Sequence, residues 1–137
     1  VDDYAHHPTE IATTLQAARD TSPKRLICVF QPHRYSRTKF LRTEFGGCFT
    51  QADILVLTDV YAAGEQPIAG ITGEVLKEEV ERQTKQSVTY IPDKANIPRY
   101  LAEIVESGDL VITMGAGNIY KTGEELVEKL LHKQQAT

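Results

Sequence analysis

Arginine and histidine side chains gather in one short segment of the chain. The segment reads QPHRYSRT from Gln31 to Thr38, and it contains His33, Arg34 and Arg37. Two arginines three residues apart at the start of a helix can point the same way, and a guanidinium binds carboxylates and phosphates through paired hydrogen bonds. The spacing therefore predicts a clamp for an anionic group. In the alternative, the pair forms a structural ion network with carboxylates of the chain itself: Asp2, Asp59 or Glu65.

A second polar segment, DDYAHHP, runs from Asp2 to Pro8. Asp3 follows a short apolar stub, and an aspartate at the end of a strand is well placed to accept hydrogen bonds from a ribose. Capping the first helix and pairing with an arginine are equally compatible with its position. His6 and His7 have no further ligands at metal-binding spacing, which favours a helix cap or a hydrogen-bonding role over a metal site.

Two more segments complete the set, Asp59–Glu65 (DVYAAGE) and Gly115–Asn118 (GAGN). The second does not satisfy the dinucleotide pattern G-x-G-x-x-G, because Tyr120 stands where the last glycine belongs. No G-x-x-x-x-G-K-[ST] phosphate-binding loop occurs in the chain. If the protein uses ATP, the main phosphate contacts must therefore come from outside these residues.

The elements that position these segments alternate between strands and helices. Short apolar runs are typical of strands buried on both faces of a parallel sheet; here they are Val1–Asp3, Leu26–Phe30, Ile54–Thr58, Val88–Ile91 and Leu110–Met114. The alternation predicts an α/β fold with a doubly wound, mostly parallel, Rossmann-like sheet flanked by helices. Ligands bind at the carboxyl ends of such strands, and all four polar segments fall there.

Helix starts are indicated by prolines at a first helical position and by capping hydroxyl groups. The predicted starts are Pro8, Ser36, Thr72, Pro98 and Thr122, the last as a Thr-x-x-Glu capping box. The apolar stripe predicted after Ser36 is Leu41, Phe45, Cys48 and Phe49, and the one after Thr122 is Leu126, Val127, Leu130 and Leu131. The irregular stretch Ala62–Ala69 receives no assignment.

Size and composition predict one globular domain covering residues 1–137. The chain has 137 residues, 41% of them hydrophobic and 25% charged, which are globular averages. A net charge of −4 argues against a nucleic-acid or anionic-membrane partner, and no apolar run approaches the ~20 residues of a membrane span. Two cysteines make no disulfide framework, so we expect a cytoplasmic protein.

The start at Val1, directly before a dense polar motif, predicts a fragment of a longer chain.

Taken together in order, four segments resemble the C-terminal domain of the Mur ligases: Asp2–Glu10, Phe30–Thr38, Asp59–Glu65 and Gly115–Ile119. The resemblance spans essentially the whole chain. It implies a three-domain ATP-dependent ligase of peptidoglycan precursor synthesis. An N-terminal UDP-binding domain and a central ATPase domain with Mg²⁺ sites would both be absent from this chain.

Within the family, the run from His33 to Arg37 resembles the members that add L-alanine to UDP-N-acetylmuramate. That resemblance implies an acyl phosphate made with ATP, followed by attack of the alanine amine. Arg34 and Arg37 would clamp the alanine carboxylate or the anionic intermediate. The other implied roles are an amino-acid pocket lined by Tyr4, His6 and His33, and an ATP ribose contact at Asp3. No catalytic residue and no metal ligand is carried over, and the chain alone is expected to be inactive.

Two other functions remain open. The branch of the family that recycles a tripeptide shares the first motif, although the His-Arg-Tyr-Ser-Arg run favours the alanine-adding members. Response-regulator receivers are also α/β domains of this length, with acidic residues after the first and third strands, where this chain has Asp2, Asp3 and Asp59. A receiver needs a lysine after its fifth strand, however, and this chain has Gly115–Asn118 there.

Overall fold

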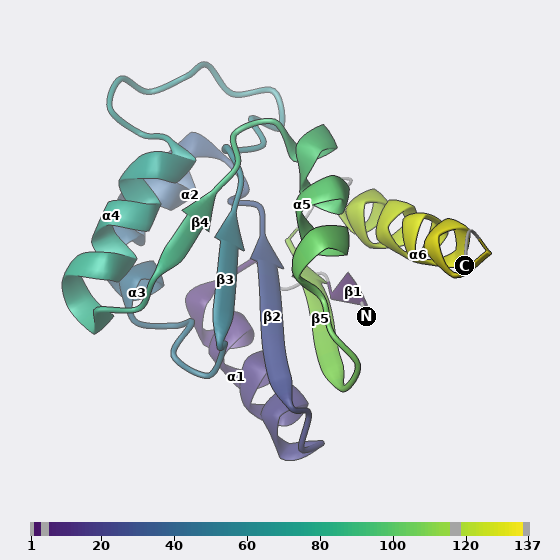
Figure 1. Cartoon of the computed structure of the whole chain (residues 1–137). Coiled ribbons are helices and arrows are strands. Elements are labelled where there is room, and N and C mark those ends of the chain that lie inside the picture. Colours follow the sequence, from purple (N-terminus) through teal and green to yellow (C-terminus); the bar gives the residue numbers. More distant parts are fainter. Residues whose placement is uncertain (1, 4–5, 116–118, 136–137) are drawn as a thin grey trace.

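A five-stranded parallel sheet forms the centre of the computed structural model, which describes residues 2–3, 6–115 and 119–135, with no side chains for 2, 3 and 132–135. The strands are β1 (Asp2–Asp3), β2 (Arg25–Phe30), β3 (Ile54–Leu57), β4 (Val88–Tyr90) and β5 (Asp109–Met114). They lie in the order β1-β5-β2-β3-β4, and every pairing is parallel (Figure 1). All five predicted strands are confirmed at nearly their predicted bounds.

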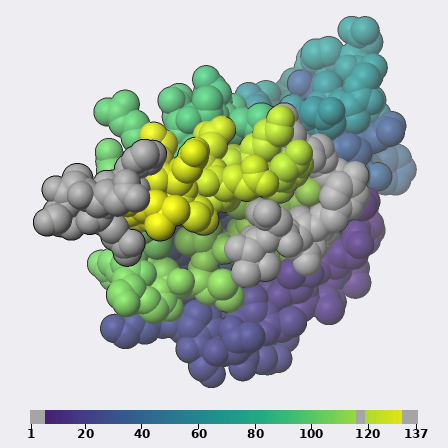
Figure 2. Space-filling view, turned by 90° about the vertical axis from the view of Figure 1, so that its right-hand side faces the viewer, coloured from purple at the N-terminus to yellow at the C-terminus, as the bar shows by residue number. Residues whose placement is uncertain are grey.

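Helices cover both faces of this sheet. They are α1 (Pro8–Asp20), α2 (Tyr35–Phe40), α3 (Arg42–Gly46), α4 (Gly73–Thr84), α5 (Ile97–Ile104) and α6 (Tyr120–Gln135), with a short 3₁₀ helix η1 (Lys94–Asn96) before α5. Buried residues of α1, α3 and α4 join one hydrophobic cluster, and those of α5 and α6 join the other. Figure 2 shows α6 lying across one side of the molecule. The doubly wound architecture is confirmed.

Strand β2 shows why its sequence is apolar without alternation. Leu26, Cys28 and Phe30 belong to the cluster under α1, α3 and α4, whereas Ile27 and Val29 belong to the cluster under α5 and α6. Successive side chains of a strand point to opposite faces, and both faces of this strand are covered. A fully buried strand therefore needs an apolar residue at every position, and all five of these residues are 0% exposed.

Helices α1 and α4 begin as predicted. His7 caps α1, because its Nδ1 accepts a hydrogen bond from the backbone N–H of Thr9 at 3.2 Å and Glu10 accepts one from the backbone N–H of His7 at 3.3 Å. This reciprocal pair is a capping box, and Pro8 follows at a position where its missing N–H costs nothing. The hydroxyl of Thr72 accepts from the N–H of Val75 at the start of α4.

Two predicted helix starts are wrong. Ser36 lies inside α2, because the chain turns at Arg34 and the helix begins at Tyr35. Its predicted helix also divides at Leu41 into α2 and α3, while the stripe residues Phe45, Cys48 and Phe49 are still buried. Thr122 is buried within α6, which begins two residues earlier, so its capping box does not form.

Two of the four residues of the apolar stripe predicted for α6 do not reach the core. Leu126 is buried and Leu130 packs partly against the cluster under α5 and α6. Val127 and Leu131 are 58% and 52% exposed. Residues four apart lie on one face of a helix, so the first pair faces the sheet and the second pair is turned away from it. No helix in the described part of the chain is long and apolar enough to cross a membrane.

The strand order places a topological switch point between β2 and β5. The chain leaves β2 toward the helices on one face and leaves β5 toward α6 on the other, and ligands of doubly wound sheets bind at such a divergence. Gly115 follows β5 directly with φ +133°, and a Cβ there would lie 2.7 Å from the carbonyl oxygen of Gln31. Only glycine allows the two strand ends to approach this closely.

Candidate functional site

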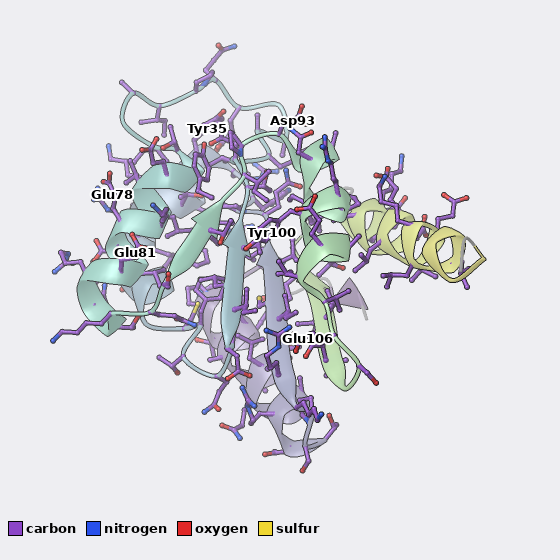
Figure 3. The ribbon with its side chains drawn as sticks, viewed as in Figure 1. Tyr35, Glu78, Glu81, Asp93, Tyr100 and Glu106 are labelled. Atoms are coloured by element: carbon purple, nitrogen blue, oxygen red, sulfur yellow. The ribbon has the colours of Figure 1, made fainter. Side chains whose placement is uncertain are left out.

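Three of the predicted polar segments meet at the carboxyl edge of the sheet. The rings of His6 and His33 lie 6.0 Å apart, edge to face, and the ring of His33 stacks on Tyr61 at 5.7 Å with an interplanar angle of 15°. In Figure 3, Tyr35 and Asp93 mark the end of the molecule toward which the strands point, and Glu106 marks the other end. The prediction that these segments converge is confirmed for the residues described.

The backbone fixes His33 beside Tyr61 after both strands have ended. The two residues form an isolated parallel bridge. The N–H of Tyr61 donates to the carbonyl of Pro32 at 2.8 Å, and the N–H of Arg34 donates to the carbonyl of Tyr61 at 2.8 Å. The segments that follow β2 and β3 therefore pair once more, and this pairing sets the place of the histidine and of the arginine after it.

The His33 ring is held in one tautomer by Arg37. The guanidinium Nη1 lies 3.0 Å from His33 Nδ1, and a guanidinium can only donate, so Nδ1 must be the acceptor. Burial, and then the charges of Arg37 and Arg34, lower the pKa of His33 below its ordinary value. At neutral pH the ring is therefore neutral, and it carries its proton on Nε2, where it can donate to a ligand.

Arg34 has an unusual backbone and an exposed side chain. Its φ is +71° and its ψ is +137°, a conformation that costs a non-glycine residue roughly 1–3 kcal/mol. The surrounding pairing enforces this turn, because the Arg34 N–H is bonded to Tyr61 and its carbonyl accepts from the N–H of Thr38 at 3.2 Å. Strain of this kind concentrates at functional sites, and the Arg34 side chain is exposed to solvent here.

Two of the carboxylates considered for a structural ion network have other partners. Glu65 accepts two hydrogen bonds from Ser36. Asp59 accepts one from the N–H of Gly73 at 2.9 Å, and it is also bonded to Tyr90, whose pKa rises to about 12 through burial and this hydrogen bond. Among the described side chains, no carboxylate forms an ion pair with Arg34 or Arg37. The third candidate, Asp2, has no described side chain.

A pocket of about 340 Å³ opens beside the two guanidiniums. It is lined by Arg34, Ser36, Arg37, Phe40 and Leu41. Phe40 is 88% exposed, although a large aromatic ring normally gains stability from burial. The arginine pair is thus presented on an open surface with an apolar wall, where it can bind the anionic group of a small ligand.

The sequence missed two residues of this site. Tyr61 belongs to a segment that the sequence singled out, but its stacking on His33 depends on the pairing beyond the strand ends. The Nζ of Lys94 lies 5.8 Å from the centre of the Tyr61 ring, within cation–π range. Burial and the nearby Lys121 lower the pKa of Lys94. No local motif marks Lys94, because only the fold brings η1 to this edge.

Some of the predicted site residues lie outside the described part of the chain. Tyr4 and residues 116–118 are not described, and of Asp3 only the backbone is, paired with Met114. Because His7 caps α1, the alternative that Asp3 caps this helix is wrong. Among the residues that the structure describes, no three histidine, cysteine, aspartate or glutamate side chains are grouped so that they could hold a metal ion.

Comparison with known proteins defines the class to which this fold and site belong. A family model described as the Mur ligase, glutamate ligase domain, matches residues 1–117. The chain therefore belongs to the Mur ligases, as its four motifs predict, and the receiver-domain alternative is wrong.

Two curated relatives are both described as UDP-N-acetylmuramate–L-alanine ligase. The protein of Trichlorobacter lovleyi is 60% identical over 131 residues, which are 95% of this chain and 29% of the relative. That of Geobacter sulfurreducens is 50% identical over 137 residues, or 99% of this chain and 30% of the relative. The chain thus spans less than a third of each of these two relatives.

Solved structures share the fold. The UDP-N-acetylmuramate–alanine ligase of Thermotoga maritima matches 95% of this chain and 26% of its own, with a TM-score of 0.70 and 22% identity. A separate domain of a putative tripeptide ligase from Haemophilus ducreyi matches 94% of this chain and 88% of its own, with a TM-score of 0.68 and 22% identity. At these identities the likeness shows the fold alone.

Proposed function

We propose that this chain is the amino-acid-binding domain of an ATP-dependent ligase that joins L-alanine to UDP-N-acetylmuramate. Support comes from the curated relatives of that description, which are 44% to 60% identical across nearly the whole chain. The resemblance of the run from His33 to Arg37 to the alanine-adding branch supports the same assignment.

The arginine pair is the single observation that carries this proposal. Arg34 is the N-cap residue of α2 and Arg37 is its third residue, and neither forms an ion pair with a described side chain. L-Alanine has only a methyl group to bury, so its affinity must come mainly from its charges. A guanidinium pair on a fixed backbone binds the carboxylate without first breaking an internal ion pair.

The neighbouring groups suit the other end of the substrate. A carboxylate held by the arginines fixes the direction of the amine. Nearby positive charge, which Lys94 also supplies, favours the uncharged amine over the ammonium form. The amine nitrogen then attacks the carbonyl carbon of the muramoyl phosphate and the C–O bond to phosphate breaks. An amide forms, and the proton lost by the nitrogen leaves with the phosphate.

The remaining components of the reaction are assigned to the rest of the protein. ATP, Mg²⁺ and UDP-N-acetylmuramate would be bound mainly there, because this chain has no phosphate-binding loop and no described metal-ligand cluster. ATP would transfer its terminal phosphoryl group to the muramate carboxylate and leave as ADP. Tyr4 and His6 are proposed to line the amino-acid pocket and Asp3 to contact the ribose. We expect this chemistry in the cytoplasm, where ATP and UDP-linked precursors are available.

Phosphate release by the full-length protein tests the proposal. With ATP, Mg²⁺ and UDP-N-acetylmuramate present, we expect release that depends on L-alanine. The 137-residue chain alone should release none, and amide synthesis by the chain alone would contradict the division of roles. Turnover with the recycled tripeptide but not with alanine would move the protein to the recycling branch.

A further inference from the structure

We propose that Glu65 is a positioning residue that braces the first turn of α2 and so keeps Arg34 and Arg37 available for the substrate carboxylate. This inference rests on the proposed function, because it concerns the same arginine pair. It assigns a role to a carboxylate that sequence analysis offered only as a possible ion-pair partner of the arginines.

Both oxygens of Glu65 accept hydrogen bonds from Ser36. Its Oε1 accepts from the backbone N–H of Ser36 at 3.1 Å, and its Oε2 accepts from the Ser36 hydroxyl. Ser36 is the second residue of α2, directly between the two arginines of the clamp. The carboxylate therefore holds the helix turn that carries the guanidiniums, and it forms no ion pair with either of them.

Helix α2 needs such a brace. It has only six residues, and its N-cap residue, Arg34, makes no side-chain capping hydrogen bond and has positive φ. Helices this short are not stable by themselves, and the N–H groups of a first turn need an acceptor. Glu65 satisfies one of these groups from a different segment, as an N-cap side chain would do from within the helix.

A tight turn directly before Glu65 fixes the position of this residue. The N–H of Glu65 donates to the carbonyl of Ala62 at 3.0 Å, across a turn in which Ala63 and Gly64 both have positive φ, +52° and +87°. The same segment is fixed at its other end, where Tyr61 exchanges backbone hydrogen bonds with Pro32 and Arg34. It therefore holds α2 at two points, one on each side of the turn at Arg34.

Electrostatics favour the same role. The pKa of Glu65 is lowered, first by its hydrogen bonds from Ser36, then by the backbone N–H of Tyr35 and last by the charge of Arg34, so the carboxylate remains ionised at neutral pH. A negative charge near two guanidiniums reduces their mutual repulsion. Because its oxygens are occupied by Ser36, Glu65 does this without covering the arginine donors that a ligand needs.

The test compares Glu65→Ala with Glu65→Gln. Glutamine can still accept the Ser36 N–H through its amide oxygen, whereas alanine accepts nothing. In the full-length enzyme we expect Glu65→Ala to raise the KM for L-alanine about tenfold, the effect of losing one charge-assisted hydrogen bond. We expect kcat to change much less, and Glu65→Gln to restore most of the loss. Glu78→Ala, an exposed glutamate on α4, is the matched control and should change neither constant.

A second measurement does not depend on the ligase reaction. In the 137-residue chain, hydrogen exchange of the Ser36 amide should accelerate in Glu65→Ala and stay slow in Glu65→Gln. If the wild-type enzyme shows no alanine-dependent turnover while the exchange result holds, the proposed function fails and the brace stands. An unchanged KM in Glu65→Ala would overturn the inference. Should Glu65→Ala not fold, Ser36→Ala removes only the hydroxyl partner, and it must raise the same KM by a smaller factor.

Discussion

Arginines at the two ends of the sheet differ in what they bind. At the end where the strands begin, Arg25 of β2 bonds Asp109 of β5 through both Nε, at 3.0 Å, and Nη2, at 2.7 Å. At the end where the strands finish, Arg34 and Arg37 have no carboxylate partner among the described side chains. The same side chain therefore serves structure at one edge and, in our proposal, a substrate at the other.

The paired end shows what a structural arginine looks like here. The Asp109 side chain is 1% exposed, and Arg19 joins α1 to Asp53 at 2.7 Å, where Asp53 also accepts from the N–H of Leu26. Arg25 thus links β2 to the first residue of β5, and Arg19 links α1 to the residue directly before β3. The pair at the carboxyl edge instead has a fixed backbone and no described carboxylate partner, and its one printed side-chain hydrogen bond joins Arg37 to the neutral ring of His33. Such a local departure from charge neutralisation is typical of binding sites.

Removing single arginines from each end of the sheet is the strongest test of this comparison. In the full-length enzyme, Arg34→Ala and Arg37→Ala should each lower kcat/KM for L-alanine by about 100-fold, as expected when a bound carboxylate loses a guanidinium. Arg25→Ala should leave the KM for alanine unchanged and reduce the resistance of the 137-residue chain to urea. The comparison fails if Arg25→Ala raises the KM as strongly as Arg34→Ala does.

Two glycines sharpen the comparison at the carboxyl edge. Gly115→Ala would place a Cβ 2.7 Å from the carbonyl of Gln31 at φ +133°, and we expect a loss of about 2–3 kcal/mol in the free energy of unfolding. Gly64→Ala is the matched control, because its φ is +87° but no atom lies within 4 Å of its Cβ. It should cost about 1 kcal/mol. Urea denaturation of the chain measures both, and equal losses would argue against the close approach of β2 and β5.

The sequence predicted the strands well because burial on both faces requires unbroken apolar runs, as in β2. It predicted the edge at which the site lies for a related reason, since parallel strands place all their carboxyl ends together. Helix starts were less predictable. The chemistry of Ser36 is that of an N-cap, and only the fold shows that its hydroxyl and N–H bond Glu65 instead.

The contacts that complete the site were beyond sequence reasoning, because they join residues far apart in the chain. Tyr61 stacks on His33 only because the two segments pair again after β2 and β3 end. Lys94 lies in η1, which is separated from Tyr61 in the sequence by α4 and β4, and only the fold brings the two side chains together. The positive φ of Arg34 was equally hidden, since arginine has no preference for that conformation and the surrounding pairing enforces it.

Acid titration tests the ion pair of Arg25 and Asp109, at the end of the sheet where the strands begin. The hydrogen bond from Arg25 is the main reason that the pKa of Asp109 lies below its ordinary value of 3.8. Its stabilising contribution is therefore complete above the unfolded pKa and is lost as the pH falls through the lower folded value. Urea midpoints measured from about pH 6 to about pH 2 should fall at the acid end, and they should fall less in Arg25→Gln. An equally steep fall in that variant would remove Asp109 as the cause.

The smallest expected effect is on the pKa of the His33 ring, which reports on the nearby charges of Arg37 and Arg34. Its pKa should lie below 6.5, because burial and two guanidiniums disfavour the charged form, and NMR titration of the chain measures it. The folded ring then binds fewer protons than the unfolded one. Its contribution to stability is complete above 6.5 and decreases as the pH falls toward the folded pKa.

Arg37→Ala should raise the His33 pKa only part of the way to 6.5, because burial, the largest cause, remains. It should also release the Nδ1 acceptor, so that the nitrogen chemical shifts no longer report a single tautomer. Lys39→Ala, an exposed cation of the same helix, provides the control and should leave the ring unchanged. If Arg37→Ala has no effect on the pKa, the guanidinium does not lie against His33.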